Sequence, residues 1–313
     1  MSIAAVVIGR NEGPRLLACL DALGAFSPVI YVDSGSTDGS VAAAQARGAQ
    51  VVSLDMALPF TAARARNAGL AAVPQDAGLV QFLDGDCVVQ AGWLPQAQGF
   101  LEAEPEVAVV CGRRREMYPE ASIYNGLIDA EWNSPVGEAL ACGGDALMRV
   151  APLRAVGGYR EDLIAGEEPE LCVRLRQAGW RIWRLDAEMT AHDAQILRFG
   201  QWWQRTRRAG HAFAEGAALH GAPPEYHWIK EVCRALLWGG VGPVLVIVLV
   251  AALGPLGLLA ALAYPLQIAR LSRAAGWMTA LFTVLGKFAE AQGALGYYWR
   301  QLSGGRKRLI EYK

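Results

Sequence analysis

The chain is poor in charged residues, and its cysteines lack the spacing of metal-binding or redox motifs. Charged residues make up 19% of the 313 residues, the net charge is −1, and the six cysteines form no CxxC pair. A near-neutral chain gives no support for a nucleic-acid partner, and unpaired cysteines of this kind are typical of a reduced domain with buried thiols. We therefore expect no nucleic acid among the partners and no disulfide framework.

Export signals are also missing from the N-terminus. Residues 3–8 form a short apolar run, with no basic segment and no long apolar stretch before them. A secretory signal peptide needs both of these features. We therefore expect the N-terminal domain to stay in the cytoplasm. The sequence also contains no internal repeat and no low-complexity tract.

Short apolar runs alternate with segments of helical periodicity. Strands are predicted at residues 3–8, 29–32, 50–54, 79–83, 107–111 and 181–185, and helices at residues 15–23, 40–47, 60–72, 168–178 and 199–219. This alternation predicts an α/β domain with a mostly parallel sheet flanked by helices. Ligands of such sheets bind beyond the carboxyl ends of the strands.

An acid-Gly-acid triplet follows the predicted strand at residues 79–83. Asp84 and Asp86 flank Gly85, and two carboxylates in this arrangement can share one Mg²⁺ or Mn²⁺ with the phosphates of a substrate. Such a cation offsets the charge of a leaving diphosphate. Most triplets of this kind are solvated turns, but the position directly after a buried strand favours a metal site.

A second acidic loop, residues 33–40, also lies between a predicted strand and a predicted helix. Its glycines allow the backbone to approach a ligand closely, and Asp33 could accept hydrogen bonds from a base or ribose. The alternative is an ordinary loop in which Ser36 or Asp38 caps the helix. Capping and binding are compatible, so both interpretations stay open.

Three carboxylates cluster at the start of the helix predicted at residues 168–178. They are Glu167, Glu168 and Glu170, and Arg174 lies one helical turn beyond them. One of them could act as a general base, because crowded acids raise one another's pKa. An acidic helix N-terminus, stabilised by the helix dipole, explains the cluster equally well.

Three further residues have both a structural and a functional interpretation. His192 lies just past the strand predicted at residues 181–185, where it is either structural, a metal ligand or a phosphate-binding group. Arg66 and Asn67 could reach the nucleotide or its phosphates, although a surface salt bridge is the default role of an arginine.

A long uncharged stretch occupies residues 235–268, and Gly254-Pro255 interrupts it near the middle. One membrane span needs about 20 apolar residues, so the stretch could be one long span, a re-entrant hairpin or two short spans. Arg234 precedes it, and Arg270 and Arg273 follow it. Basic residues at both ends favour a hairpin with both ends in the cytoplasm; a pair of buried core helices is the alternative.

An amphipathic segment, residues 274–300, follows the uncharged stretch and ends next to basic residues 306–308. Aromatic residues beside basic ones suit the lipid headgroup region. We therefore expect residues 221–313 to form a membrane-associated helical region behind a catalytic domain at residues 1–220.

Together these motifs resemble family 2 glycosyltransferases, which have the A-type nucleotide-sugar transferase fold. The resemblance runs in consistent order over about residues 3–195. Its motifs are VVIGRNE at residues 6–12, YVDSGSTDGS at 31–40, ARNAG at 65–69, FLDGD at 82–86, VGGY at 156–159, GEEPELCVRLRQAGW at 166–180, and finally His192.

The resemblance assigns roles to these residues. On the donor side it implies nucleotide binding by Asn11, Glu12, Asp33, Arg66, Asn67 and Asp84. For a divalent cation, Mg²⁺ or Mn²⁺, it implies Asp84, Asp86 and His192, with Asp86 the more direct ligand. Glu168 takes the place of the catalytic base, which is usually an Asp in the family. Glu167, Glu170 and Arg174 are candidates for the acceptor side.

The function expected from this resemblance is an inverting, metal-dependent, hexosyltransferase-like glycosyltransferase that uses a nucleoside-diphosphate sugar. Ser34 replaces a frequent second Asp, which leaves base recognition open, and Glu168 is one methylene longer than the usual base. Residues 201–205 (QWWQR) only loosely match the Gln-x-x-Arg-Trp motif of processive synthases, so we expect transfer of single sugars.

We expect a membrane lipid or lipid-linked acceptor in polysaccharide biosynthesis at the cytoplasmic face of the inner membrane, and we leave a homo-oligomer open. Two other functions remain as alternatives. A sugar nucleotidyltransferase normally has a longer, Gly-rich and basic first loop than residues 9–14. A non-catalytic membrane scaffold would not need the intact acidic residues and His192.

Overall fold

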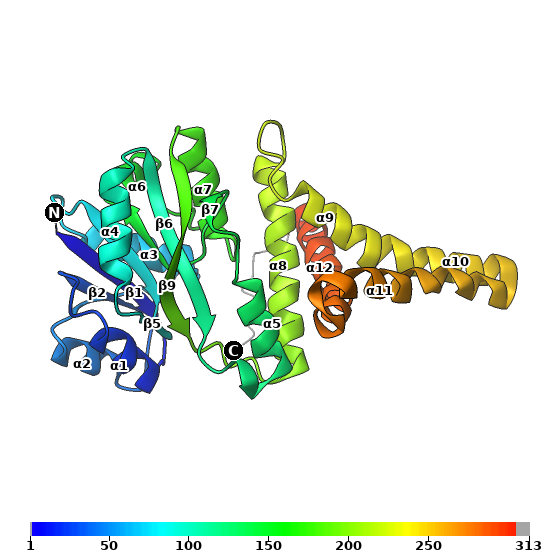
Figure 1. Cartoon of the computed structure of the whole chain (residues 1–313), viewed down its shortest axis with the longest axis horizontal. Helices are drawn as coiled ribbons and strands as arrows, with labels where there is room; N and C mark the ends of the chain where they lie inside the picture. The colour runs from blue at the N-terminus through cyan, green and yellow to red at the C-terminus, as the bar shows by residue number, and fades with distance from the viewer. Residues whose placement is uncertain (1, 305–313) are drawn as a thin grey trace. The chain divides into compact units, whose positions relative to one another are not determined.

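The computed structural model describes residues 2–304, and its contacts divide the chain into two compact units. The first unit is Met1–Leu197 and the second is Arg198–Lys313 (Figure 1). The helix that precedes residue 220 belongs to the second unit by these contacts. The domain boundary predicted at residue 220 stays a prediction, and the basic residues 306–308 lie outside the described residues.

The first unit is built on a nine-stranded sheet, in the order β3-β2-β1-β4-β8-β6-β9-β5 with β7 paired to β9. The strands are β1 (Ile3–Gly9), β2 (Val29–Asp33), β3 (Gln50–Ser53), β4 (Leu79–Asp84), β5 (Cys87–Val89), β6 (Val107–Glu116), β7 (Gly137–Ala139), β8 (Ala146–Arg149) and β9 (Arg181–His192). β1 to β4 are parallel, and so are β6 and β9. β5, β7 and β8 pair with their neighbours in the antiparallel sense.

Helices follow most of these strands, as the alternating pattern predicts. They are α1 (Pro14–Asp21), α2 (Ser40–Ala46), α3 (Ala62–Ala72), α4 (Trp93–Ala103), α5 (Ile123–Glu131), α6 (Val150–Ala155) and α7 (Glu167–Gln177), with a 3₁₀ turn, η1 (Pro119–Ala121). α3 packs on β1 and β2, and α4 packs on β6 and β9. β1 is buried from Ile3 to Ile8, which explains its continuous apolar sequence.

Two strands extend beyond their predicted ends. β6 continues to Glu116 and β9 continues to His192, because the two strands pair along most of their length with register shifts at bulges. The sequence predicts His192 just past the end of a strand. In the structure, His192 is the last residue of β9. β9 alternates between buried and exposed positions, so its polar residues are compatible with a strand whose two faces differ.

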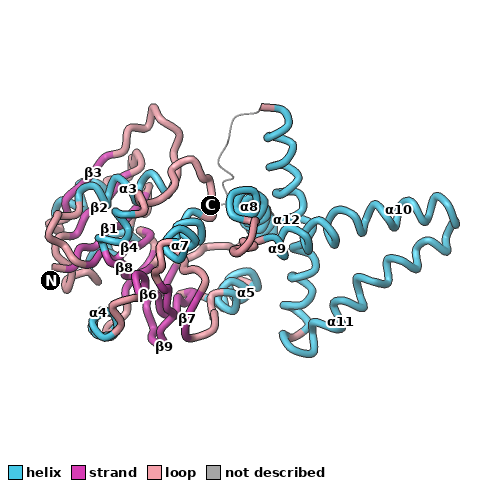
Figure 2. Tube along the Cα trace, turned by 90° about the horizontal axis from the view of Figure 1, so that it is seen from above, coloured by secondary structure: helices cyan, strands magenta, loops and turns pink. Residues whose placement is uncertain are grey.

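The second unit is helical. Its elements are α8 (Phe199–His220), α9 (Ile229–Leu236), the π-helical η2 (Leu237–Val241), α10 (Gly242–Leu253), the 3₁₀ segment η3 (Gly254–Leu262), α11 (Ala263–Ala275) and α12 (Trp277–Ser303). Figure 2 shows α10 and α11 as two neighbouring arms joined at one end. By length and composition, Ile229–Ala275 is apolar enough to cross a membrane, and only 6% of its most apolar window is buried inside the protein.

The amphipathic segment predicted at residues 274–300 corresponds to α12, which packs closely on α8. A Cβ at Gly210 of α8 would lie 2.0 Å from the carbonyl oxygen of Glu290, and a Cβ at Gly293 would lie 2.0 Å from that of Arg207. The two helix backbones are therefore in direct contact at both glycines. Part of the apolar character of α12 serves this helix–helix core.

α3 approaches the sheet closely because it has a glycine at the point of contact. A Cβ at Gly69 would lie 2.3 Å from Val6 Cγ1 and 3.1 Å from Val32 Cγ2. Both valines belong to the buried central strands. The position of α3, and of every side chain that it carries to the site, therefore depends on the missing side chain at residue 69.

We predict that Gly69→Ala lowers the free energy of unfolding of the first unit by about 1–3 kcal/mol, because the extra methyl overpacks the core. Urea denaturation followed by circular dichroism measures the change. Gly99→Ala is the matched control, since Gly99 lies on α4 with open space around it and alanine there gains up to about 1 kcal/mol of helix propensity. Equal effects of the two substitutions would contradict the packing argument.

Candidate active site

The carboxyl ends of three parallel strands meet at one edge of the sheet. Gly9 at the end of β1 is in register with Asp33 at the end of β2, and Ile8 is in register with Asp84 at the end of β4. The loops that follow these strands therefore lie side by side. This is the edge at which α/β sheets bind their ligands.

The first acidic loop is shaped by the carboxylate of Asp33, which is buried. Its Oδ2 accepts hydrogen bonds from the backbone N–H groups of Gly35 and Ser36, both at 3.0 Å, and its Oδ1 accepts one from the Tyr31 hydroxyl at 3.1 Å. Burial raises the pKa of Tyr31, so the hydroxyl keeps its proton as the donor. Asp33 thus fixes the conformation of the loop that follows β2.

The loop after β1 is bound to the loop after β2. The Asn11 side-chain oxygen accepts a hydrogen bond from Thr37 N at 2.7 Å, and Asn11 N donates to Ser36 Oγ at 2.9 Å. Asn11 has a φ of 54°, a left-handed conformation that asparagine tolerates better than most residues. Glu12 forms an ion pair with Arg15 at 2.6 Å. The structure therefore places Asn11 and Glu12 next to the Asp33 loop.

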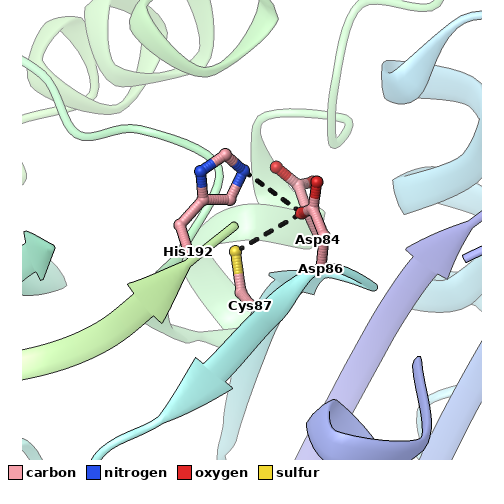
Figure 3. Close-up of side chains that lie close together, drawn as sticks. All are labelled: Asp84, Asp86, Cys87 and His192. Atoms are coloured by element: carbon pink, nitrogen blue, oxygen red, sulfur yellow. Dashed lines mark hydrogen bonds and ion pairs between the residues drawn. The ribbon is translucent and has the colours of Figure 1, made fainter. Parts of the chain in front are cut away.

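The acid-Gly-acid triplet and His192 form a compact cluster at the same edge (Figure 3). Pairing of β5 with β9 puts Cys87 opposite His192, and His192 Nε2 lies 3.2 Å from Asp86 Oδ1. Ligand atoms of Asp84, Asp86, Cys87 and His192 all lie within 4.8 Å of one another. Two carboxylates and an imidazole are suitable ligands for Mn²⁺ or Mg²⁺.

Two observations indicate which of the four side chains would bind the cation. His192 Nε2 faces Asp86 Oδ1, whereas Nδ1, on the other side of the ring, lies 4.0 Å from Glu116 Oε2, so Nε2 is the atom that the imidazole presents to the cluster. Cys87, which the sequence analysis missed, is fully buried, and burial raises the pKa of its thiol well above the usual value. A neutral thiol is a poor ligand for a hard cation, which leaves Asp84, Asp86 and His192.

Arg66 connects this cluster to the acidic start of α7. Its side chain is only 3% exposed, and it contacts three carboxylates: Asp84 Oδ1 at 3.0 Å, Glu167 Oε1 at 2.7 Å and Glu168 Oε1 at 3.0 Å. Burial alone would lower the pKa of Arg66, but the three acids raise it. The guanidinium is therefore a buried, permanently charged link between Asp84 and Glu168.

Glu168 has the properties expected of a general base. Burial, followed by the neighbouring charge of Glu167, raises the pKa of Glu168 to about 7, and Arg66 opposes this increase. Its side chain is 15% exposed, whereas that of Glu167 is 5% exposed. A Cβ at Gly144 would lie 2.4 Å from Arg66 Nη2 and 3.1 Å from Glu168 Oε1, so only glycine leaves room for this pair.

A second arginine network, which the sequence analysis also missed, lies on the other side of Asp84. Arg114 contacts buried Asp145 Oδ1 at 2.7 Å and lies 3.8 Å from Asp84 Oδ2. Thr190 donates to Asp145 Oδ2 at 2.7 Å, and Arg114 stacks over Trp132 with its Cζ 5.1 Å from the ring centroid. An Asp after Gly143-Gly144 was the available signal for this network.

Three predicted site residues have structural partners elsewhere. Glu170 and Arg174 form a bidentate pair, with Nη2 to Oε2 at 2.8 Å, and Arg174 also donates to the carbonyl oxygens of Val156 and Gly158. Asn67 makes two hydrogen bonds to the backbone of Tyr159, both at 2.8 Å. These residues hold the turn at Gly157-Gly158 and are not gathered with Asp84, Asp86 and His192.

The fold and the site together are those of a nucleotide-sugar transferase of the A type, and the comparisons identify the family. A family model described as glycosyl transferase family 2 matches residues 4–144. An uncharacterised glycosyltransferase of Mycobacterium tuberculosis is 30% identical over 192 residues, which cover 59% of this chain and 84% of that protein. The chain belongs to glycosyltransferase family 2, as its motifs predict.

Other relatives match over shorter parts of their length. The pre-mycofactocin glycosyltransferase of M. tuberculosis is 31% identical over 50% of this chain and 35% of its own length. The succinoglycan biosynthesis protein ExoA of Rhizobium meliloti is 30% identical over 56% of this chain and 52% of its own length. The chain thus spans between a third and about half of the length of these two relatives.

Solved structures confirm the predicted fold. The mannosyltransferase PcManGT from Pyrobaculum calidifontis, in complex with GDP-Man and Mn²⁺, superposes with a TM-score of 0.69 at 22% identity and covers 94% of this chain and 86% of its own. Glucosyl-3-phosphoglycerate synthase from M. tuberculosis, with Mn²⁺, UDP-glucose and phosphoglyceric acid, has a TM-score of 0.51 at 22% identity and covers 71% and 80%.

The cluster generates a prediction about cation binding. Mn²⁺ should bind to the purified full chain, and Asp86→Asn or His192→Gln should weaken binding at least about tenfold, because each removes one ligand. Electron paramagnetic resonance of free Mn²⁺ measures this without any activity assay. Glu188→Gln is the control, since Glu188 forms only an exposed pair with Arg115. Unchanged Mn²⁺ affinity in both ligand variants would exclude the cluster as the cation site.

Proposed function

We propose that the chain is an inverting, metal-dependent glycosyltransferase that transfers a sugar from a nucleoside-diphosphate sugar to a hydroxyl group of a lipid-linked acceptor. The observation that carries this proposal is the link through Arg66. The guanidinium of Arg66 contacts both Asp84 of the acid-Gly-acid triplet and Glu168, whose pKa is about 7. A transferase needs a site for the leaving diphosphate and a base for the attacking hydroxyl close together, because both groups react at the same sugar carbon.

The donor is proposed to lie at the carboxyl ends of β1, β2 and β4. There the Asp33 and Asn11 loops would face the nucleoside, and Asp84, Asp86 and His192 would hold a divalent cation. When bound, the cation offsets the charge that develops on the diphosphate. The structures of PcManGT with GDP-Man and Mn²⁺ and of the synthase with UDP-glucose and Mn²⁺ support a donor and a cation of this class.

Glu168 is proposed to act on the acceptor. Its ionised carboxylate removes the proton from the acceptor hydroxyl, the oxygen attacks C1 of the sugar, and the nucleoside diphosphate leaves from the opposite face. One displacement of this kind inverts the anomeric centre. Arg66 keeps Glu168 in place and favours its ionised form, while Glu167 and burial oppose ionisation, so the base is poised near neutral pH.

The proposed acceptor is a lipid-linked sugar or a membrane lipid at the cytoplasmic face of the inner membrane, where a cell-surface glycan is built. The long apolar stretch in the second unit supports membrane attachment. Arg234, Arg270 and Arg273 at its two ends support a cytoplasmic location of both ends. The similarity to a succinoglycan biosynthesis protein is compatible with this pathway class.

Donor turnover tests the proposal. Detergent-solubilised protein should release one nucleoside diphosphate from a panel of nucleotide sugars with Mn²⁺ or Mg²⁺ and a membrane lipid extract, and EDTA should stop the release. Asp86→Ala should abolish the release, because the cation that offsets the charge of the diphosphate loses a ligand. The Glu188→Gln variant should still release the diphosphate. Absence of release from every donor would favour a non-catalytic scaffold.

The pKa of Glu168 sets a pH dependence. Because the base must be ionised and its pKa is about 7, turnover should fall as the pH drops below 7, to about a tenth of its maximum at pH 6. Glu168→Gln should lower turnover by about 10²–10⁴-fold at pH 8 and should remove this acidic limb.

Glu167→Gln separates the base from its neighbour. Removal of this charge lowers the pKa of Glu168, so the acidic limb should move to lower pH while activity at pH 8 is largely retained. Measurement of the rate constant for turnover between pH 5 and 9 checks both variants. If Glu167→Gln instead abolished turnover and Glu168→Gln did not, Glu167 would be the base.

A further inference from the structure

The apolar stretch of the second unit reverses direction at a single glycine. Gly254, with a φ of 62°, directly follows α10 and is the first residue of η3. The returning chain then packs tightly against the outgoing one, because a Cβ at Gly257 would lie 2.3 Å from the backbone of Leu249 and Val250. Near the open end, Tyr264 donates to the carbonyl oxygen of Trp238 at 2.8 Å. The two arms therefore form a helical hairpin whose arms contact each other both near the tip and near the open end.

The surface of this hairpin is apolar apart from Tyr264 and Gln267 on the second arm, toward its open end. α10 consists entirely of apolar residues and glycine and proline, and although the structure describes it completely, none of its residues is buried. Large side chains that are more than half exposed occur on both arms: Val244, Leu245, Ile247, Val248, Leu253, Leu256, Leu258, Leu259, Leu262 and Leu266. A helix that is apolar all round is buried either in a protein core or in lipid, and the described protein buries no residue of α10.

Charged residues occur only at the open end of the hairpin. No Asp, Glu, Lys or Arg lies between Ala235 and Ala269. Arg234 precedes the first arm, Arg270 and Arg273 end the second, and all three are exposed. Trp277, directly after them, is 64% exposed. Arginines with a nearby tryptophan are typical of the headgroup layer.

The first arm is at the short end of the length that a complete crossing needs, and its tip is apolar. From Ala235 to Leu253 the arm spans about 28 Å, whereas the hydrocarbon core is about 30 Å thick. Residues 251–259 at the tip have no polar side chain. A hairpin that crosses the bilayer would end in a loop suited to water on the far side.

We infer that residues 235–269 form a re-entrant hairpin that enters a lipid bilayer from one face, turns inside the hydrocarbon at Gly254-Pro255 and returns to the same face. The occupant of its apolar surface is lipid, and both ends of the hairpin lie at the cytoplasmic face of the bilayer. This inference rests on the membrane attachment in the proposed function, and it defines how that attachment is made.

Thiol labelling in membranes tests the inference. Among the described cysteines Cys233 alone is exposed, next to the first arm, so it reports on one end of the hairpin. In a Cys233→Ser background, Ala274→Cys reports on the other end and Pro255→Cys on the tip; all of these positions are exposed in the protein. Right-side-out and inverted inner-membrane vesicles are treated with a membrane-impermeant maleimide, before and after detergent.

Cys233 and the Ala274→Cys thiol should react in inverted vesicles, and the Pro255→Cys thiol should react at least about tenfold less in both orientations until detergent is added. Labelling of Pro255→Cys in right-side-out vesicles would show a hairpin that crosses the bilayer. Labelling of the two ends from opposite sides would show a single span. A soluble dimer in which the Pro255→Cys thiol is protected would show that a second copy covers the arms.

Donor release measured on the same vesicles separates the two proposals. Active protein with a tip that reacts from the far side overturns the hairpin inference and leaves the proposed function intact. Inactive protein with the expected labelling pattern overturns the proposed function and leaves the hairpin inference intact.

Discussion

The buried guanidinium of Arg66 is the interaction on which the active site depends. Asp84, Glu167 and Glu168 come from two distant segments, and without a cation between them their charges would repel one another in a site of low polarity. Arg66 can reach all three because α3 lies flat on the sheet, which in turn requires the missing side chain of Gly69. The packing of α3 on the sheet therefore also sets the spacing of Asp84, Glu167 and Glu168.

Asp84 lies between two arginines, and this explains the division of work in the acid-Gly-acid triplet. Arg66 contacts one of its oxygens, and Arg114, fixed by Asp145, lies near the other. Asp86, in contrast, faces the imidazole of His192. Asp84 is thus held by protein partners on both of its oxygens, while Asp86 is left to interact with the cation that we propose.

The sequence predicted those parts of the site that follow from local patterns, and it missed those that depend on distant contacts. Asp33, Asp84 and Asp86 follow apolar strands, so the convergence of parallel strand ends predicts their shared edge. The paired roles of Arg66 and Arg114 arise from contacts over more than 30 residues of sequence. The i, i+4 spacing predicts the Glu170–Arg174 pair, but tertiary packing decides that it faces the Gly157-Gly158 turn. Composition predicted an apolar stretch that Gly254-Pro255 interrupts, and the structure shows that the chain reverses direction there.

Some positions of the second unit tolerate substitution much less than others, and its glycines show which. At Gly210, Gly239 and Gly293 the backbones of neighbouring helices touch, so any side chain would separate α12 from α8 or from the base of the hairpin. Apart from the turn at Gly254 and the close approach at Gly257, the arms beyond that base contact little protein and require only apolar character. Exchanges among Leu, Ile, Val and Ala should therefore be common in the exposed positions of the arms, whereas the three glycines should rarely be substituted over the same evolutionary time.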